Sequence, residues 1–262
     1  MTKPLILVTN DDGIMAPGLS VLAHSMLQLG EVVVVAPDKP QSGMGHAITV
    51  SNPLRLEKLH YSNGSPLKNI EQLFTCSGTP VDCVKLAIDK VLNRKPDLLV
   101  SGMNHGSNSS INVIYSGTMS AALEGAIERI PSIGFSYLSH SFDADLSLAA
   151  KYAAIIAKQV LKNNLPIGTC LNVNIPVVDQ ATLKGVRICR QSKAYWSDEY
   201  DERTDPNNRN YYWLTGVLEN FDLSEDTDEW ALKNNYISIV PVQADLTAHN
   251  AIFQLKNWNF ND

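Results

Sequence analysis

The stretch "LILVTNDDGIMAPGL", residues 5–19, decides the fold. Its apolar start runs directly into two adjacent carboxylates, Asp11 and Asp12, and then into Gly13. A short apolar run that stops at turn residues predicts a buried strand. Neighbouring like charges disfavour each other's ionised form and are costly to desolvate at the edge of a core. The pair therefore indicates either a cation bound at the end of the strand or an ordinary solvated turn, because Asn, Asp and Gly are also common turn residues.

Strand-like and helix-like segments alternate after this turn. Apolar residues three and four apart predict a helix that ends near Gly30, with the inward positions Leu19, Leu22, Met26 and Leu29. The run "EVVVVAP" at 31–37 predicts a second buried strand. This alternation is typical of parallel βαβ units, so the fold class is α/β, with a mostly parallel sheet flanked by helices.

The rest of the chain extends the pattern and then departs from it. Residues 46–75 combine partial alternation with turn residues, which predicts an antiparallel excursion. A helix is expected to begin at Thr79, as its N-cap, with Pro80 at the first helical position. A strand at 96–102 and a helix from 117 follow. From about residue 186 the helical period is lost and polar and aromatic residues dominate, which favours an irregular, β-rich arm over core.

The length and composition indicate one large domain. The chain has 262 residues, of which 44% are hydrophobic, and it contains no internal repeat or low-complexity tract. We interpret 1–262 as a single α/β domain, with a core at about 1–185, a protruding arm at about 186–231 and a C-terminal segment at 232–262.

Charge and cysteine content exclude several classes of partner and site. Lys and Arg number 21 against 27 Asp and Glu, so the net charge of −6 predicts no binding to a nucleic-acid polymer or to an anionic membrane. The cysteines form no CxxC pair, which argues against a zinc ribbon and favours reduced thiols: Cys76, Cys83, Cys170 and Cys189. No secretory leader pattern or membrane-spanning stretch is evident, so a cytoplasmic location is expected.

Polar side chains collect after three predicted strands. Asp11 and Asp12 follow the first strand, Ser42 lies in the loop at 38–46 after the second, and Asn104 follows the strand at 96–102. In open α/β sheets ligands bind beyond the carboxyl ends of the strands. Two carboxylates, a hydroxyl and an amide oxygen are hard donors suited to Mg²⁺, Mn²⁺ or Ca²⁺. The sequence therefore predicts one divalent cation per subunit at this edge.

A phosphate site is predicted beside the cation. Ser116, Gly117 and Thr118 open a helix, where backbone N–H groups and hydroxyls can approach an anion. The similar "SGTP" at 77–80 is better explained as an ordinary cap. Asn10 and Gly43 are candidate substrate-binding residues, although Asn10 can simply hold its loop and Gly43 can serve a turn.

Histidines are candidate proton donors, and several other chemistries lack support. His46, His105 and His249 are weaker candidates for protonating a leaving group, because surface histidines are common. GxGxxG, GxxxxGK[ST], GxSxG and HExxH are absent from the predicted strand ends, so dinucleotide, P-loop, serine-hydrolase and zincin functions have no motif here.

Taken together, these residues closely resemble the SurE family of nucleotidases. The matching stretches cover much of the first half in family order: "ILVTNDDGIMAPGL" at 6–19, "APDKPQSGMGHAIT" at 36–49, "CSGTPVDCVKLA" at 76–87 and "PDLLVSGMNHGSNSSINVIYSGTMSAALEGAI" at 96–127. The second half matches mainly in "PVQADLTAH" at 241–249. The resemblance implies a Rossmann-like core and metal-dependent hydrolysis of nucleoside monophosphates, chiefly as a 5′-nucleotidase, with 3′-nucleotidase and exopolyphosphatase activity on short polyphosphate as further expectations.

The resemblance also assigns roles to residues. The family's metal ligands fall on Asp11, Asp12, Ser42 and Asn104, with the two aspartates as the catalytic pair. A further family asparagine falls on Asn108, and the phosphate-side Ser-Gly-Thr falls on residues 116–118. The C-terminal part forms arms exchanged between subunits in the family, which implies a homodimer or homotetramer. Aromatic residues in this part could stack on a base or line a subunit interface, and we favour the interface: Tyr195, Trp196, Tyr200, Tyr211, Tyr212 and Trp213.

Two other functions remain open at this stage. A phosphatase that forms an aspartyl-phosphate also begins with an apolar strand and aspartates, but it needs Asp-x-Asp, and Gly13 stands at the second position. A nucleotide-binding module that senses without hydrolysis would use the same metal and phosphate groups. The identity of the general acid or base, the preferred base and the preferred metal are not decided by these residues.

Overall fold

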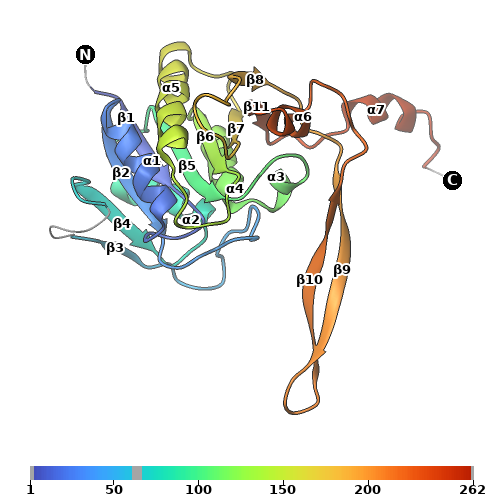
Figure 1. Cartoon of the computed structure of the whole chain (residues 1–262). Coiled ribbons are helices and arrows are strands. Elements are labelled where there is room, and N and C mark those ends of the chain that lie inside the picture. The colour runs from blue at the N-terminus through green and yellow to red at the C-terminus, as the bar shows by residue number, and fades with distance from the viewer. Residues whose placement is uncertain (1–2, 61–66, 261–262) are drawn as a thin grey trace.

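The computed structural model describes residues 3–60 and 67–260. Its main feature is a nine-stranded sheet in the order β3-β4-β2-β1-β5-β6-β7-β11-β8 (Figure 1). The central strands are parallel, and their bounds are β1 Leu5–Thr9, β2 Glu31–Pro37, β4 Gln72–Cys76, β5 Leu98–His105, β6 Ser132–Tyr137 and β7 Thr169–Ile175. The predicted α/β class is confirmed.

The opening stretch forms the middle of this sheet. Every residue of β1 is buried, and the strand pairs in parallel with β2 on one side and β5 on the other. The helix α1, Pro17–Leu27, follows with Pro17 in its first turn, where the missing N–H of proline costs nothing. The strand and helix predicted from 5–30 are therefore confirmed.

Helices cover both faces of the sheet. The helices α1 and α5 (Ser147–Asn163) pack on one face, over a core that includes Ile6, Val8 and Phe135. The helices α2 (Pro80–Leu86) and α4 (Gly117–Ile127) pack together on the other face, over Leu5 and Leu7. Because successive residues of β1 point to opposite faces, this one strand contributes to both cores.

The second helix begins as predicted. Thr79 is the N-cap of α2: its hydroxyl accepts from the Asp82 N–H, and the Asp82 carboxylate accepts from the Thr79 N–H. This reciprocal capping box satisfies two backbone donors that a helix start leaves unpaired. The helix continues into a π-helical turn, η1, at Ala87–Val91.

The predicted antiparallel excursion is also present. The edge strand β3, Leu56–Lys58, pairs antiparallel with β4. Residues 61–66, which the prediction also covered, lie outside the described residues.

The C-terminal part contributes more to the sheet than the sequence pattern indicates. The short strand β8, Val186–Ile188, pairs with β11, Ile237–Gln243, and β11 runs antiparallel to β7. Both strands lie beyond residue 185, where the core was expected to end. The helix α6, Asp228–Lys233, precedes β11, and α7, His249–Leu255, follows it.

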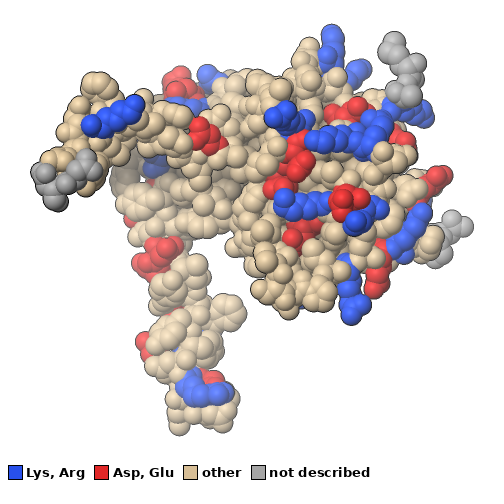
Figure 2. Space-filling view, turned by 180° about the vertical axis from the view of Figure 1, so that it is seen from behind, with Lys and Arg blue, Asp and Glu red and all other residues tan. Residues whose placement is uncertain are grey.

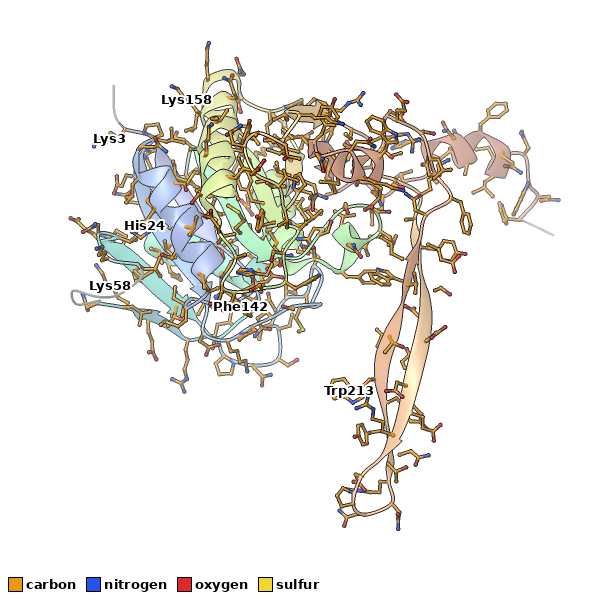
Figure 3. All side chains as sticks on the ribbon, viewed as in Figure 1. Lys3, His24, Lys58, Phe142, Lys158 and Trp213 are labelled. Atoms are coloured by element: carbon orange, nitrogen blue, oxygen red, sulfur yellow. The ribbon has the colours of Figure 1, made fainter. Side chains whose placement is uncertain are left out.

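The protruding arm is a single long hairpin. Strands β9, Tyr195–Thr204, and β10, Asn210–Glu219, pair with each other and form a separate two-stranded sheet that projects from the body (Figure 1). Its aromatic and aliphatic side chains are largely exposed; Trp213, near the tip, is labelled in Figure 3. The hairpin at 195–219 therefore covers fewer residues than the arm predicted at about 186–231.

Surface and cysteine features agree with the composition. Basic and acidic side chains are interspersed on the back of the body (Figure 2). All four cysteines are buried and free of disulfides. No helix in the described part of the chain is long and apolar enough to cross a membrane.

Candidate active site

The carboxyl ends of β1, β2 and β5 bring the predicted metal residues to one edge of the sheet. Asn10, Asp11 and Asp12 follow β1 immediately, and β5 ends on Asn104 and His105 beside it. The loop after β2 reaches the same place, because the Gln41 N–H donates to the Asp11 backbone oxygen over 2.7 Å. Adjacent parallel strands therefore gather three separate segments.

Asp11 is held against the start of α4. Its side chain is almost fully buried, and the Thr118 hydroxyl donates to its Oδ1 over 2.5 Å. A Cβ on Gly117 would lie 2.7 Å from the Asp11 Cβ, so only glycine lets the helix approach this closely. Burial raises the pKa of Asp11 to about 6, and repulsion from Asp12 adds to the effect. Among the described residues, no cationic side chain forms an ion pair with this carboxylate.

Asp12 presents an unsatisfied oxygen to the same place. Its Oδ2 is buried without a hydrogen-bond partner in the described chain, and so is the Oδ1 of Asn10. Burial raises the pKa of Asp12, although the His105 backbone N–H counteracts this. Asn10 donates its amide to the Gly13 backbone oxygen over 2.9 Å, which fixes the turn and leaves its oxygen pointing elsewhere. A buried acceptor without a donor calls for an explanation such as a bound ion.

Ser42 and Asn104 differ in how firmly they are placed. Ser42 is exposed and lies next to Gln41, with Gly43 after it in a left-handed conformation (φ 74°). The structure thus brings the Ser42 loop to Asp11 without placing its hydroxyl in contact with either carboxylate. Asn104 sits where the register between β5 and β6 shifts, and its Nδ2 donates to the Gly106 backbone oxygen over 2.9 Å. That bond fixes the amide and leaves its oxygen for a ligand.

The start of α4 offers both a backbone donor and a hydroxyl. The Ser116 hydroxyl is the N-cap; it accepts from the Met119 N–H over 3.0 Å and keeps its own hydrogen to donate. The hydroxyl and the backbone N–H of Thr118 both bond to Asp11. The first N–H groups of a helix have no partner within the helix, so that of Gly117 can face an anion.

Asn108 is buried within a chain of amides. Its Nδ2 donates to the Ser136 hydroxyl over 2.8 Å, and its backbone N–H and C=O pair with the side chains of Asn174 and Asn172 on β7. One hydrogen of the Asn108 amide remains for a ligand, because an amide carries two.

The three histidines have different surroundings. His46 forms an ion pair with buried Glu124 on α4 over 2.9 Å, so it ties the Ser42 loop to that helix. His105 directly follows Asn104; burial of its ring lowers its pKa, and the Ser141 backbone nearby opposes that shift. Its ring packs on Phe142, which Figure 3 labels below α1. His249 pairs with Asp245 and lies on α7, whereas the aspartates follow β1 (Figure 1).

Sequence reasoning missed several polar residues behind the site. They are Glu124 on α4, Asn172 and Asn174 on β7, and Asp228 and Glu229 on α6. They stand within helices or strands, without a recognisable motif around them. The available signal was the occurrence of polar residues in an otherwise apolar strand, as in "CLNVNIP" at 170–176.

The donor set fits a hard divalent cation. The carboxylates of buried Asp11 and half-buried Asp12, both with raised pKa values, and two orphaned oxygens, on Asn10 and Asp12, face one edge of the sheet. No group of three or more His, Cys, Asp or Glu side chains gathers within residues 3–60 and 67–260, so the donors here are two carboxylates supplemented by neutral oxygens. Such a set suits Mg²⁺, Mn²⁺ or Ca²⁺ better than zinc.

Comparisons with known proteins agree on the family. Residues 6–198 match the model of the family described as survival protein SurE. The chain is 58% identical to "5′-nucleotidase SurE" of Christiangramia forsetii, over 99% of this chain and 98% of that protein. It is 57% identical to the protein of the same name from Flavobacterium psychrophilum, over the full length of both.

A solved structure extends this agreement to three dimensions. The crystal structure of the SurE protein from Aquifex aeolicus superimposes with a TM-score of 0.82, at 37% identity, and the match covers 97% of this chain and 98% of that one. The likeness therefore includes the parts of the sequence where motifs were weak. By sequence over nearly its whole length and by fold, the chain belongs to the SurE family.

Proposed function

We propose that this protein is a metal-dependent nucleoside-monophosphate phosphohydrolase that acts as a 5′-nucleotidase. The observation that carries the proposal is the juxtaposition of Asp11 and Asp12 with the start of α4. There, buried Asp11 and half-buried Asp12, which no cationic side chain of the described residues balances, lie beside the N-terminus of a helix. Family membership and the names of the relatives support the nucleotide substrate.

The metal would be held by Asp11, Asp12, Ser42 and Asn104. When bound, a divalent cation offsets the negative charge of the phosphoryl oxygens and lowers the pKa of bound water. The protein's own contribution is placement. Thr118 orients one oxygen of Asp11, the His105 N–H orients Asp12, and Gly106 holds the Asn104 amide. These contacts fix the ligands before substrate arrives, so little reorganisation is needed.

The phosphate would lie between the cation and α4. The N–H group of Gly117 lies at the positive end of the helix, and the hydroxyl hydrogen of Ser116 and the remaining Asn108 amide hydrogen would add neutral donors. Fixed donors aimed at the phosphoryl oxygens stabilise charge that grows in the transition state. Asn10 and Gly43 line the same loops and complete the proposed binding set.

His105 is the best-placed histidine for the leaving oxygen. It directly follows Asn104, and burial lowers the pKa of its ring. A neutral imidazole is a poor proton donor, so His105 would protonate the leaving oxygen only in its charged form. His46 is engaged by Glu124 and acts in this proposal through the loop it anchors. His249 is engaged by Asp245 on the C-terminal segment.

The arm supports assembly into a homodimer or homotetramer. An isolated two-stranded hairpin is marginal in water, and this one exposes Trp213, Leu214 and Val217 at 59%, 63% and 67%. Covering these side chains with a second copy would stabilise the arm. A cytoplasmic location is proposed on the four free cysteines.

Phosphate release tests the proposed function. The protein is treated with chelator and assayed on 5′- and 3′-nucleoside monophosphates and on tripolyphosphate, and Mg²⁺, Mn²⁺ or Ca²⁺ is then restored. We expect release from 5′-monophosphates that disappears with chelator and returns with metal. Binding of nucleotide without release under any metal would instead support the sensing module.

A further inference from the structure

Asp228, at the start of α6, joins two segments that are far apart in the sequence. Its side chain is fully buried. Its Oδ2 accepts from the Ser110 N–H over 2.7 Å, and its Oδ1 accepts from the Ser192 N–H over 2.9 Å. Ser110 lies in the loop that follows Asn108, and Ser192 lies three residues before β9 of the arm begins. One carboxylate therefore links the arm's root to the loop behind the candidate phosphate site.

The two segments are also bonded to each other. The Ser110 hydroxyl donates to the Ser192 backbone oxygen over 3.0 Å and accepts from the Ala194 N–H over 3.2 Å. Further along, the Trp196 indole N–H donates to the Asn112 side-chain oxygen over 2.7 Å. Figure 1 shows α6 close to the root of the hairpin. The loop at 107–112 is thus fastened along its length to the base of the arm.

The same loop is suspended between α6 and β7. On the α6 side, the Ser109 hydroxyl donates to Glu229 over 2.5 Å. On the β7 side, Asn174 and Asn172 hold the backbone of Asn108 over 2.8 Å each. Residues 106–110 form neither helix nor strand, so these side-chain bonds define their conformation. Ser110 adopts a positive φ of 53°, a conformation that needs such support in a residue with a side chain.

Burying a carboxylate is costly unless its acceptors are satisfied. Three backbone N–H groups donate to the Asp228 carboxylate, those of Ser110, Ser192 and Glu229. A charged acceptor makes stronger and shorter bonds to such donors than a neutral one does. The arrangement gives the loop a fixed attachment point that a hydrophobic residue of similar size would lack.

We propose that Asp228 is a positioning residue for the reaction: it holds Ser110, and through the loop Asn108, in the geometry that binds the phosphate. The inference rests on the proposed function, in which Asn108 donates to a phosphoryl oxygen. The root of the arm would also help to position this loop, because the Ser192 N–H donates to the same carboxylate. Misplacement of a binding group by a fraction of an ångström weakens substrate binding without removing the metal ligands.

The test compares Asp228→Asn with Asp222→Asn. The amide retains the shape of the side chain but turns a donor toward a backbone N–H. Asp222 lies at the same arm root, and its side chain bonds Arg190 over 2.6 and 2.9 Å, which makes it a matched control away from the loop. We expect Asp228→Asn to raise both KM for AMP and the inhibition constant of inorganic phosphate about tenfold. The Asp222→Asn values, and the Mn²⁺ affinity of both variants, should stay within about twofold of wild type.

A milder variant covers the case in which Asp228→Asn does not fold, which thermal unfolding would reveal. Ser110→Ala removes the hydroxyl but keeps the N–H that Asp228 accepts, and a rise of about threefold in the two constants is expected. Unchanged constants in the folded variants, or an equal rise in Asp222→Asn, would overturn the inference. An inactive wild-type protein would instead refute the proposed function, so the two failures are distinguishable.

Discussion

The carboxyl edge of the sheet and the β9–β10 arm differ in where their order comes from. At the edge, Asp11 is enclosed by α4 and its loop and is bonded by Thr118. In the arm, backbone pairing from Tyr195 to Thr204 is regular, but the side chains on both faces are exposed. The edge is complete within one chain, whereas the arm leaves apolar surface that one chain does not cover.

This difference separates chemistry from assembly. Burial of unbalanced charge at the edge costs free energy that a bound cation would recover. Exposure of aromatic side chains in the arm costs free energy that a second subunit would recover. Substitutions at the edge should therefore reduce turnover more than assembly. Substitutions in the arm should reduce the mass of the assembly in solution more than turnover.

The largest expected effect is at Asp12. Asp12→Asn removes a proposed ligand, and we expect phosphate release from AMP to fall by at least about a hundredfold. The apo protein should unfold at the same temperature or a higher one, because a repulsive buried charge is lost. The matched control is Asp38→Asn, an exposed aspartate in the neighbouring loop. Full activity in the Asp12 variant would contradict the assignment.

A smaller loss is expected at the contact between α4 and Asp11. Gly117→Ala places a methyl group 2.7 Å from the Asp11 Cβ, so the helix must shift away. We expect about a tenfold loss in kcat/KM, despite the better helix propensity of alanine. Steady-state kinetics and thermal unfolding would separate the two effects. Unchanged kinetics would mean that the close approach of α4 has no role.

Substitutions in the arm should affect assembly more than catalysis. Trp213→Ser combined with Leu214→Ser removes exposed apolar surface near the tip. We expect sedimentation to show a shift toward monomer, while kcat/KM per chain changes by less than about threefold. An unshifted assembly, or a loss of activity as large as that at Gly117, would break the proposed separation.

The smallest effect concerns stability at Glu124. His46 and Lys85 bond this buried carboxylate and hold its pKa below its ordinary value of 4.5. A lowered folded-state pKa stabilises the protein above that ordinary value, and the contribution is lost as the pH falls through the folded-state pKa. Glu124→Gln should therefore cost about 1–2 kcal/mol at pH 7, and this cost should shrink as the pH falls below 4.5. Thermal unfolding across this range would show the difference shrink; a constant difference would contradict the ionic origin.

The parts of the fold that the sequence predicts are those where local signals and burial agree. Thr79 and Pro80 predict the start of α2, and the apolar run before Asp11 predicts the central strand. The hairpin was predicted only as irregular, because strands exposed on both faces show no hydrophobic alternation. The strand β8 has three residues, too few for any periodic signal.

The candidate site divides in the same way. The proposed ligands lie at strand ends or in the loops that follow them, so the topology of an α/β sheet predicts that they meet. The residues that position the proposed ligands have no recognisable sequence pattern. Asp228 is brought to Ser110 across 118 positions of sequence, and Asn174 to Asn108 across 66. Only the packed structure reveals such contacts, because long-range pairs of single polar residues leave no local pattern.

Cation binding tests the central claim most directly. Mn²⁺ binding to the chelator-treated protein would be measured by calorimetry and by electron paramagnetic resonance, alongside Asp12→Asn and the Asp38→Asn control. The account predicts one Mn²⁺ per chain in the wild type and in the control, with binding lost in Asp12→Asn together with phosphate release. Equal binding in all three proteins, or phosphate release that chelator leaves untouched, would contradict it.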